Sequence, residues 1–175
     1  RWVVKVNRLI THQSKFSDRA IETWKKFQGL FLPMVEMIDF FLFQLPPNLT
    51  PQARNKIETF LVRTGINEQC ALEPRHTAWF SDEVYQWAKD LKITWVSIDA
   101  PEFSRDIIKT TDTVYLRMHG RTGWYYHNYS PSELKEIARR ILATRPGRIY
   151  IFFNNNHNML KNAQMMEKIL SGRTR

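Results

Sequence analysis

Short apolar runs alternate along the chain with segments in which apolar residues recur at helical spacing. The runs are rich in β-branched and aromatic residues and predict strands at residues 2–6, 40–45, 69–73, 94–98, 113–118 and 148–153. Most of them have no regularly spaced polar positions, which is typical of strands covered on both faces, as in parallel sheets. The pattern therefore predicts an α/β fold built on a parallel sheet.

The segments between the strands carry recognisable helix ends. Ser130 is followed by Pro131 and by Glu133, the spacing of a capping box with proline in the first turn. Gly65 follows a periodic segment at the place where a helix commonly ends in a left-handed residue. Helices are expected at residues 20–27, 51–64, 81–91, 130–142 and 158–170.

The spacing of these strands is typical of repeated βα units, and two architectures compete. A doubly wound sheet of six strands would be complete in 175 residues, whereas an eight-stranded TIM barrel takes about 250 residues. No glycine-rich phosphate loop follows a strand, which argues against a nucleotide-binding sheet. Because the chain begins at Arg1 without an initiator Met and looks internal, we expect residues 1–175 to form a single partial TIM barrel domain. It would hold strands 3 to 8 and lack the N-terminal units.

The composition is that of a folded domain. Apolar residues make up 43% of the chain and charged residues 25%, and the longest apolar stretches are far shorter than the ~20 residues of a spanning helix. No membrane association is therefore expected. Cys70 is the one cysteine of the sequence, which excludes an intrachain disulfide and favours a reducing compartment. We expect a cytoplasmic protein.

The net charge is positive and lies mainly in the C-terminal half. Residues 1–87 hold 11 lysines and arginines against 9 acidic residues, and residues 88–175 hold 15 against 8, for a total of +9. A basic surface concentrates anions such as phosphoesters or nucleic acid around the protein. The same residues are also those of an ordinary solvated helix face, so both interpretations stay open.

Polar residues follow each predicted strand. In a parallel barrel the carboxyl ends of all strands surround one mouth, so we expect these side chains to form one convergent site. The candidate ligand-binding residues are Lys5, Asn7, Arg8, Gln44, Arg75, His76, Arg117, Trp124, Tyr125, Asn154 and Asn155. The candidate catalytic residues are Glu73, Asp99 and His119.

The chemistry of this set is mainly cationic. Arginine and lysine bind phosphate or carboxylate through charge-assisted hydrogen bonds. Glu73 and Asp99 either transfer a proton or pair structurally with the arginines, and His119 is placed to assist. Trp124 and Tyr125 either stack on a base or sugar of the ligand or pack against the following helix.

A metal centre is not predicted. The residues of the right type are His12, Glu73, His76, Asp99 and His119. They show neither a His-Glu-x-x-His helix nor paired cysteines, which are the spacings that indicate zinc. No cofactor is indicated, and no Gly-x-Ser-x-Gly elbow supports a serine nucleophile.

Several of these segments together resemble one family. The matching stretches are VKVNRLITH at 4–12, FQLPP at 43–47, ALEPRHTAWF at 71–80, VYLRMHG at 114–120, WY at 124–125, NYS at 128–130, FNN at 153–155 and NA at 162–163. In this order they resemble the YecE-like family of uncharacterised TIM-barrel proteins, a domain of unknown function. The resemblance spans nearly the whole chain and implies a barrel.

The resemblance also indicates where this chain differs from the other members of the family. Family members look like full barrels, and this chain begins at about their third strand. Asn156 stands where the family usually has an aspartate, which removes a possible metal ligand or base. The family implies no activity.

Three functions are therefore considered. The first is an enzyme-type barrel whose mouth binds a small phosphorylated ligand or nucleic acid, with phosphoester hydrolysis as the candidate reaction. The second is a noncatalytic nucleic-acid-binding protein, whose affinity would fall steeply with salt. The third is a metal-dependent hydrolase or isomerase. Substrate, reaction and oligomeric state are not determined by the sequence.

Overall fold

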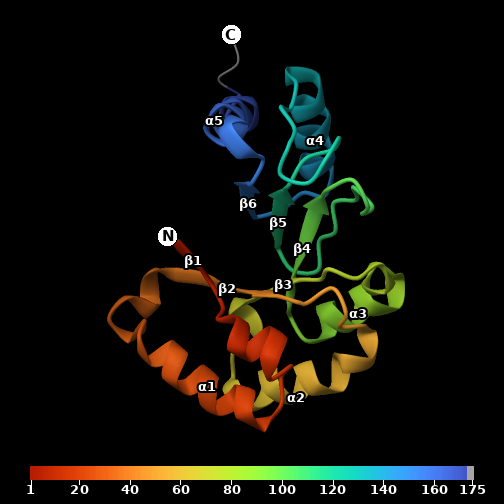
Figure 1. Cartoon of the computed structure of the whole chain (residues 1–175). Helices are drawn as coiled ribbons and strands as arrows, with labels where there is room; N and C mark the ends of the chain where they lie inside the picture. The colour runs from red at the N-terminus through yellow and green to blue at the C-terminus, as the bar shows by residue number, and fades with distance from the viewer. Residues whose placement is uncertain (173–175) are drawn as a thin grey trace. The chain divides into compact units, whose positions relative to one another are not determined.

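The computed structural model describes residues 1–172 in two compact units, Arg1–Trp95 and a second unit that begins at Val96 (Figure 1). Strand β4 (Thr94–Asp99) runs across this division. Its first two residues pair with β3, and the residues from Val96 onward pair with β5. The single domain expected for the chain stays a prediction.

All the strands of the sheet are parallel and follow one another in sequence order, from β1 to β6. The remaining strands are β1 (Trp2–Lys5), β2 (Ile38–Gln44), β3 (Cys70–Glu73), β5 (Thr113–Met118) and β6 (Arg148–Phe153). Each lies within two residues of a predicted segment. The α/β class and the parallel sheet are therefore confirmed.

The predicted TIM barrel is wrong for this chain. A TIM barrel is closed by eight strands, and the sheet formed by residues 1–172 has six, with β1 and β6 at the two ends of the strand order. The barrel was inferred from the βα repeat and from the family resemblance. A βα repeat produces parallel strands in sequence order whether or not the sheet closes, so its period does not reveal whether the sheet forms a barrel.

The core of the first unit is aromatic. It is formed by the sheet together with α1 (Asp18–Gly29), α2 (Arg54–Thr64) and α3 (Asp82–Asp90). Trp24 on α1 is fully buried, and its ring centroid lies 5.0 Å from that of Phe41 and 5.5 Å from that of Phe43. Phe60 of α2 closes the cluster at 6.1 Å from Trp24. These contacts fix the two helices on one face of β2.

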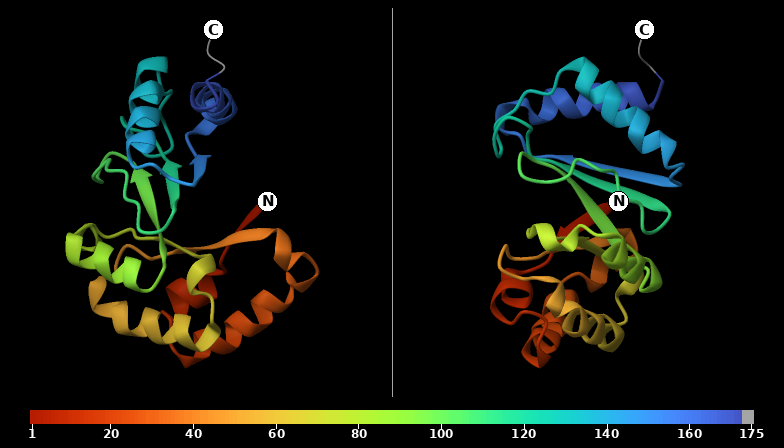
Figure 2. Two further views of the ribbon diagram at one scale, coloured as in Figure 1. Left: turned by 180° about the vertical axis from the view of Figure 1, so that it is seen from behind. Right: turned by 90° about the vertical axis from the view of Figure 1, so that its right-hand side faces the viewer.

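In the second unit, α4 (Pro131–Ala143) and α5 (Met159–Leu170) lie side by side over one face of β5 and β6 (Figure 2). Leu116 and Met118 of β5 pack beneath Leu134 of α4 and Met166 of α5. The predicted capping box is confirmed, because Glu133 N donates to Ser130 Oγ and Ser130 N donates to Glu133 Oε2.

The other predicted helix end is also confirmed. Gly65 ends α2 with a φ of 67°, and its N–H donates to the carbonyl of Leu61. The start of this helix differs from the prediction, because Pro51–Ala53 form a 3-10 turn and the α-helix begins at Arg54. Within residues 1–172, no helix combines the length and apolar character needed to cross a bilayer.

Replacing Trp24 tests whether the aromatic cluster holds the first unit together. Burial of a large aromatic ring stabilises the folded state, and its loss leaves a cavity. We therefore expect Trp24→Ala to lower the free energy of unfolding by about 3–5 kcal/mol. Trp2, which is 57% exposed, provides the matched control, and Trp2→Ala should cost less than about 1 kcal/mol. Urea denaturation measures both, and equal losses for the two variants would contradict this account.

Candidate functional site

The register of the sheet decides which strand-end residues lie on the same face. Paired residues of neighbouring parallel strands point to the same side, and successive residues alternate. Phe41 and Phe43 pack against Trp24 of α1, so Gln44 lies on the face away from these helices. Glu73 pairs with Gln44 and therefore lies on that face too.

Three of the predicted residues meet around the Glu73 carboxylate. Gln44 Nε2 donates to its Oε2 at 3.1 Å, and Arg75 Nη2 donates to its Oε1 at 2.6 Å. Glu73 is fully buried, and the side chain of Arg75 is only 11% exposed. Each carboxylate oxygen thus has a donor, which stabilises the ionised form of a buried carboxylate.

A second group of predicted residues follows β1. Asn7 Oδ1 accepts a hydrogen bond from Leu9 N at 2.9 Å, which fixes the turn that carries Arg8. The π-helical turn η1 (Leu9–Gln13) then brings His12 into the group. Burial lowers the pKa of His12, and the charges of Arg8 and Lys5 lower it further. The cations of Lys5 and Arg8 therefore lie close enough to act on this imidazole.

His76 has a local structural role. Its Nδ1 accepts a hydrogen bond from Ala78 N at 3.1 Å and caps the 3-10 turn η5 (Thr77–Trp79) that follows β3. A ring nitrogen that accepts from the backbone fixes the orientation of the ring. The structure thus holds His76 at the end of β3, where the sequence predicts a ligand-binding residue.

In the second unit the register separates Asp99 from Arg117. Asp99 pairs with Met118, which packs beneath α4 and α5, so its side chain lies on the helix-covered face. Arg117 pairs with Ile98 and Phe152 and lies on the opposite face. The two side chains leave the sheet in opposite directions, although both come from the ends of neighbouring strands.

Asp99 is the centre of a buried polar network. Tyr129 donates its hydroxyl to Asp99 Oδ1 at 2.9 Å, and Arg121 donates Nε to Oδ2 at 3.0 Å. The hydroxyl oxygen of Tyr129 also accepts from Gly120 N at 3.0 Å. Burial raises the pKa of Tyr129, and the neighbouring Asp99 charge raises it further. The phenol therefore stays protonated and acts as a permanent donor to the carboxylate.

The sequence interpretation did not select Arg121 or Tyr129. Arg121 also donates to Glu136 of α4 at 3.1 Å, so it links the loop after β5 to this helix. Both residues lie in the loop from 119 to 130, which also carries the predicted site residues His119, Trp124 and Tyr125. Their pairing with Asp99 crosses 22 and 30 positions of the chain, and no local pattern indicates it.

His119, Trp124 and Tyr125, all predicted site residues, lie together. The ring centroid of His119 is 5.4 Å from those of both Trp124 and Tyr125. Tyr125 has a φ of 62°, a strained conformation for a bulky residue, and its N–H donates to the carbonyl of His119. His119 is buried and Tyr125 is 46% exposed. The cluster thus presents one accessible ring beside a buried imidazole.

The two asparagines after β6 have different surroundings. Asn154 N extends the ladder by donating to the carbonyl of Met118 at 2.8 Å. Asn155 is fully buried, and its Nδ2 donates to the carbonyl of His127 and to Asn162 Oδ1, both at 2.7 Å. Asn162 of α5 is a third residue that the site prediction omitted, after Arg121 and Tyr129.

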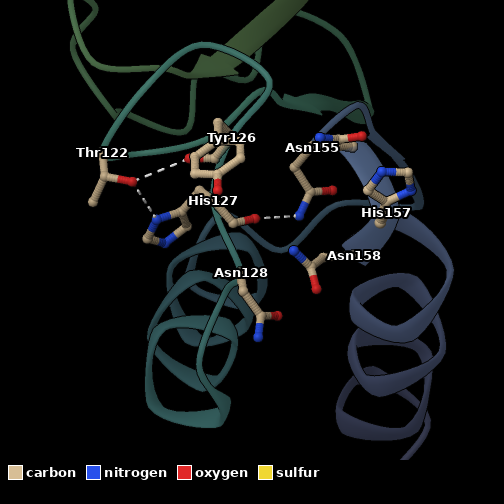
Figure 3. Close-up of a pocket in the computed structure, with 8 residues that line it drawn as sticks. Thr122, Tyr126, His127, Asn128, Asn155, His157 and Asn158 are labelled. Carbon is tan, nitrogen blue, oxygen red and sulfur yellow. Dashed lines mark hydrogen bonds between the residues drawn. The ribbon is translucent and has the colours of Figure 1, made fainter.

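A cavity of about 320 Å³ opens beside Asn155 (Figure 3). It is formed by the loop between β5 and α4 and by the turn between β6 and α5. Its lining residues are all uncharged amides, hydroxyl-bearing residues or histidines: Thr122, Tyr126, His127, Asn128, Asn155, Asn156, His157 and Asn158. We call it the amide cavity. Of the described residues, 1–172, no three of type His, Cys, Asp or Glu are grouped so that they could hold a metal ion.

Two solved structures resemble the chain along nearly its whole length. One is a DUF72 family protein of Thermotoga maritima MSB8, with a TM-score of 0.81 and 27% identity, covering 97% of this chain and 73% of the other. The second is a DUF72 family protein of Enterococcus faecalis V583, with a TM-score of 0.84 and 20% identity, covering 98% and 74%. At 20% identity the second shows a shared fold alone.

Among curated proteins, none matches the chain. The family model described as "Protein of unknown function DUF72" matches residues 1–175, the entire sequence. The resemblance to a family of uncharacterised proteins is thereby confirmed at the level of this family. The chain belongs to the DUF72 family.

Proposed function

We propose that this chain binds an anionic ligand, a phosphorylated small molecule or a nucleic acid, through the basic residues after β1. Lys5, Arg8 and His12 are named the basic cluster. Lys5 and Arg8 are exposed, and His12 is half-buried beside them. The observation that carries the proposal is that the end of β1 and the turn η1 after it place three basic residues in close succession at one strand end, two of them exposed.

Electrostatics explains why such a cluster favours an anion. Like charges held close together repel, and a bound phosphate removes this repulsion while it accepts charge-assisted hydrogen bonds. Arg8 offers the planar donor fork that matches a phosphate, and Lys5 offers a point charge. The net charge of +9 adds a long-range attraction of the same sign.

Binding is supported more directly than hydrolysis. The carboxylates proposed as catalytic, Glu73 and Asp99, each accept hydrogen bonds on both oxygens. None of these carboxylate oxygens is therefore left without a donor from the protein. A phosphoester hydrolase with Glu73 as base is therefore only the second candidate. A YecE-like assignment within the family and a cytoplasmic location stay predictions.

Anion binding should raise the pKa of His12. A phosphate beside the ring stabilises the imidazolium form of His12. The pKa of His12 should therefore rise when inorganic phosphate or a short oligonucleotide is added. The titration is followed by NMR of the imidazole. A pKa of His12 that is the same with and without saturating anion would contradict the proposal.

The arginine of the cluster has a matched control elsewhere in the same unit. Arg8→Ala removes one of the two cations, so the pKa of His12 in the free protein should rise toward its ordinary value. Arg19 is an exposed arginine at the start of α1, and Arg19→Ala should leave this pKa unchanged. Equal shifts in the two variants would show a general charge effect and not a local cluster.

Affinity measurements distinguish the two kinds of anion. Arg8→Ala should weaken binding of single-stranded DNA and lower the slope of log K against log salt by about 0.7, the value for one lost phosphate contact. A phosphate monoester should show a smaller salt dependence because it carries fewer charges. Retention of the full affinity and slope by Arg8→Ala would exclude the basic cluster as the binding site.

A further inference from the structure

The amide of Asn162 has a fixed orientation. Its Oδ1 lies 3.2 Å from Tyr129 N, and its Nδ2 lies 3.1 Å from the carbonyl oxygen of Tyr129. A backbone N–H only donates and a backbone carbonyl only accepts, so these two contacts determine which end of the Asn162 amide is oxygen. Asn162 Oδ1 is therefore an acceptor at a known place.

The orientation of Asn155 follows from that of Asn162. One end of its amide lies 2.7 Å from Asn162 Oδ1 and 2.7 Å from the carbonyl oxygen of His127. Both neighbours are acceptors, so this end must be the NH₂ group, and both of its hydrogens are used. The other end is Oδ1, which cannot be exchanged with the nitrogen by a flip.

Asn155 Oδ1 has no donor. Asn155 is fully buried, and none of the described residues donates a hydrogen bond to this oxygen. Buried acceptors are nearly always satisfied, so one without a donor calls for an additional group. In Figure 3 the NH₂ group points to the His127 carbonyl, and the oxygen points away from it, to the side where His157 lies.

The lining of the amide cavity restricts the chemistry of that group. No lysine or arginine lines it, and no carboxylate lines it. An ionised phosphate oxygen only accepts hydrogen bonds, so it would meet Asn155 Oδ1 with two acceptors facing each other. A hard divalent cation prefers carboxylate ligands, which this lining lacks. The missing partner must instead bring an O–H or N–H donor.

A hydroxyl group fits the remaining requirements. It donates to one amide oxygen and accepts from a neighbouring amide NH₂, and the cavity offers both functions from Asn128, Asn156 and Asn158. Tyr126 is 75% exposed at the cavity, where its ring supplies a flat apolar surface for the C–H face of a sugar. A volume of about 320 Å³ lies at the lower end of the range for small-molecule pockets.

One wall of the cavity is rigid. His127 Nε2 lies 3.0 Å from Glu133 Oε1, and its Nδ1 lies 3.2 Å from Thr122 Oγ1. Both ring nitrogens therefore have partners, and the ring is held between the loop and the start of α4. The opposite wall contains His157 and Asn158. Within residues 1–172, the structure gives no hydrogen bond to either of these two side chains.

We propose that the amide cavity binds a neutral polyhydroxylated ligand of monosaccharide size, with one hydroxyl donating to Asn155 Oδ1. The site lies wholly in the second unit and takes an uncharged ligand. It is thus separate from the basic cluster, and its failure or success leaves the proposed anion binding untouched.

The test uses the full chain and defined probes. D-glucose, D-ribose and inorganic phosphate are titrated into ¹⁵N-labelled protein, and the side-chain amide signals of Asn155 and Asn128 are followed by NMR. We expect a sugar to shift the Asn155 signals in a saturable manner and phosphate to leave them unchanged. Saturable shifts with phosphate alone, or no shift with either sugar, would overturn the proposal.

Variants separate binding from folding. Asn155→Ala would break the bonds to His127 and Asn162 and could unfold the loop, so it is not used. Asn158→Ala and His157→Ala should weaken sugar binding at least fivefold with an unchanged melting temperature. Asn48→Ala, at an exposed asparagine in the loop after β2, is the matched control and should bind normally.

A crystal structure of the chain soaked in the same sugar completes the test. A hydroxyl oxygen within hydrogen-bonding distance of Asn155 Oδ1 is the expected result. An ordered water alone at this oxygen, with the sugar absent or bound elsewhere, would mean that the buried acceptor is satisfied by solvent and would refute the ligand site.

Discussion

The register of the parallel ladder is the constraint on which the rest of this structure depends. Because side chains alternate across a strand, one pairing such as Gln44 with Glu73 fixes the face of each residue in both strands. Phe41 and Phe43 of β2 are thereby directed at α1 and α2, and Gln44 and Glu73 at the strand ends are directed away from them. In the first unit, the aromatic core and the polar candidate site both follow from the pairing of β2 with β3.

The same constraint gives Asp99 surroundings that its position at a strand end does not indicate. Its pairing with Met118 directs the carboxylate toward the helices, where a charge needs hydrogen-bond donors. Tyr129 and Arg121 supply them, and both belong to the loop between β5 and α4. The buried carboxylate of Asp99 thus orders this loop, because each of its two oxygens accepts a hydrogen bond from a loop residue.

Asn162 orders the other end of that loop. By bonding both backbone groups of Tyr129, it ties α5 to the residue that also contacts Asp99. Asn155 then joins the network through its NH₂ group. Among the described residues, both amide NH₂ groups of this network donate hydrogen bonds, whereas the buried Asn155 Oδ1 accepts none. A ligand site supported by such a network is held in place before the ligand arrives.

Local features of the fold were predictable from the sequence alone. Strand positions follow from runs of β-branched and aromatic residues, and the ends of α2 and α4 follow from Gly65 and from the Ser130 capping box. These signals act over a few residues, because a cap or a left-handed glycine depends on its own turn. The family followed from the order of several such segments.

The site was predictable only in part. The sequence correctly indicated that Gln44, Glu73 and Arg75 would meet, because the carboxyl ends of adjacent parallel strands are neighbours. It placed Asp99 with Arg117, which the register separates, and it omitted Tyr129, Arg121 and Asn162.

What the sequence determined by itself was therefore the class of fold, the elements and the residue types at the strand ends. The tertiary structure decided the face on which each strand-end side chain lies and the partner that each buried polar group finds. Those properties depend on pairings between residues some 20 to 40 positions apart, such as Asp99 with Tyr129. A one-residue change of register would reverse them without altering any local pattern.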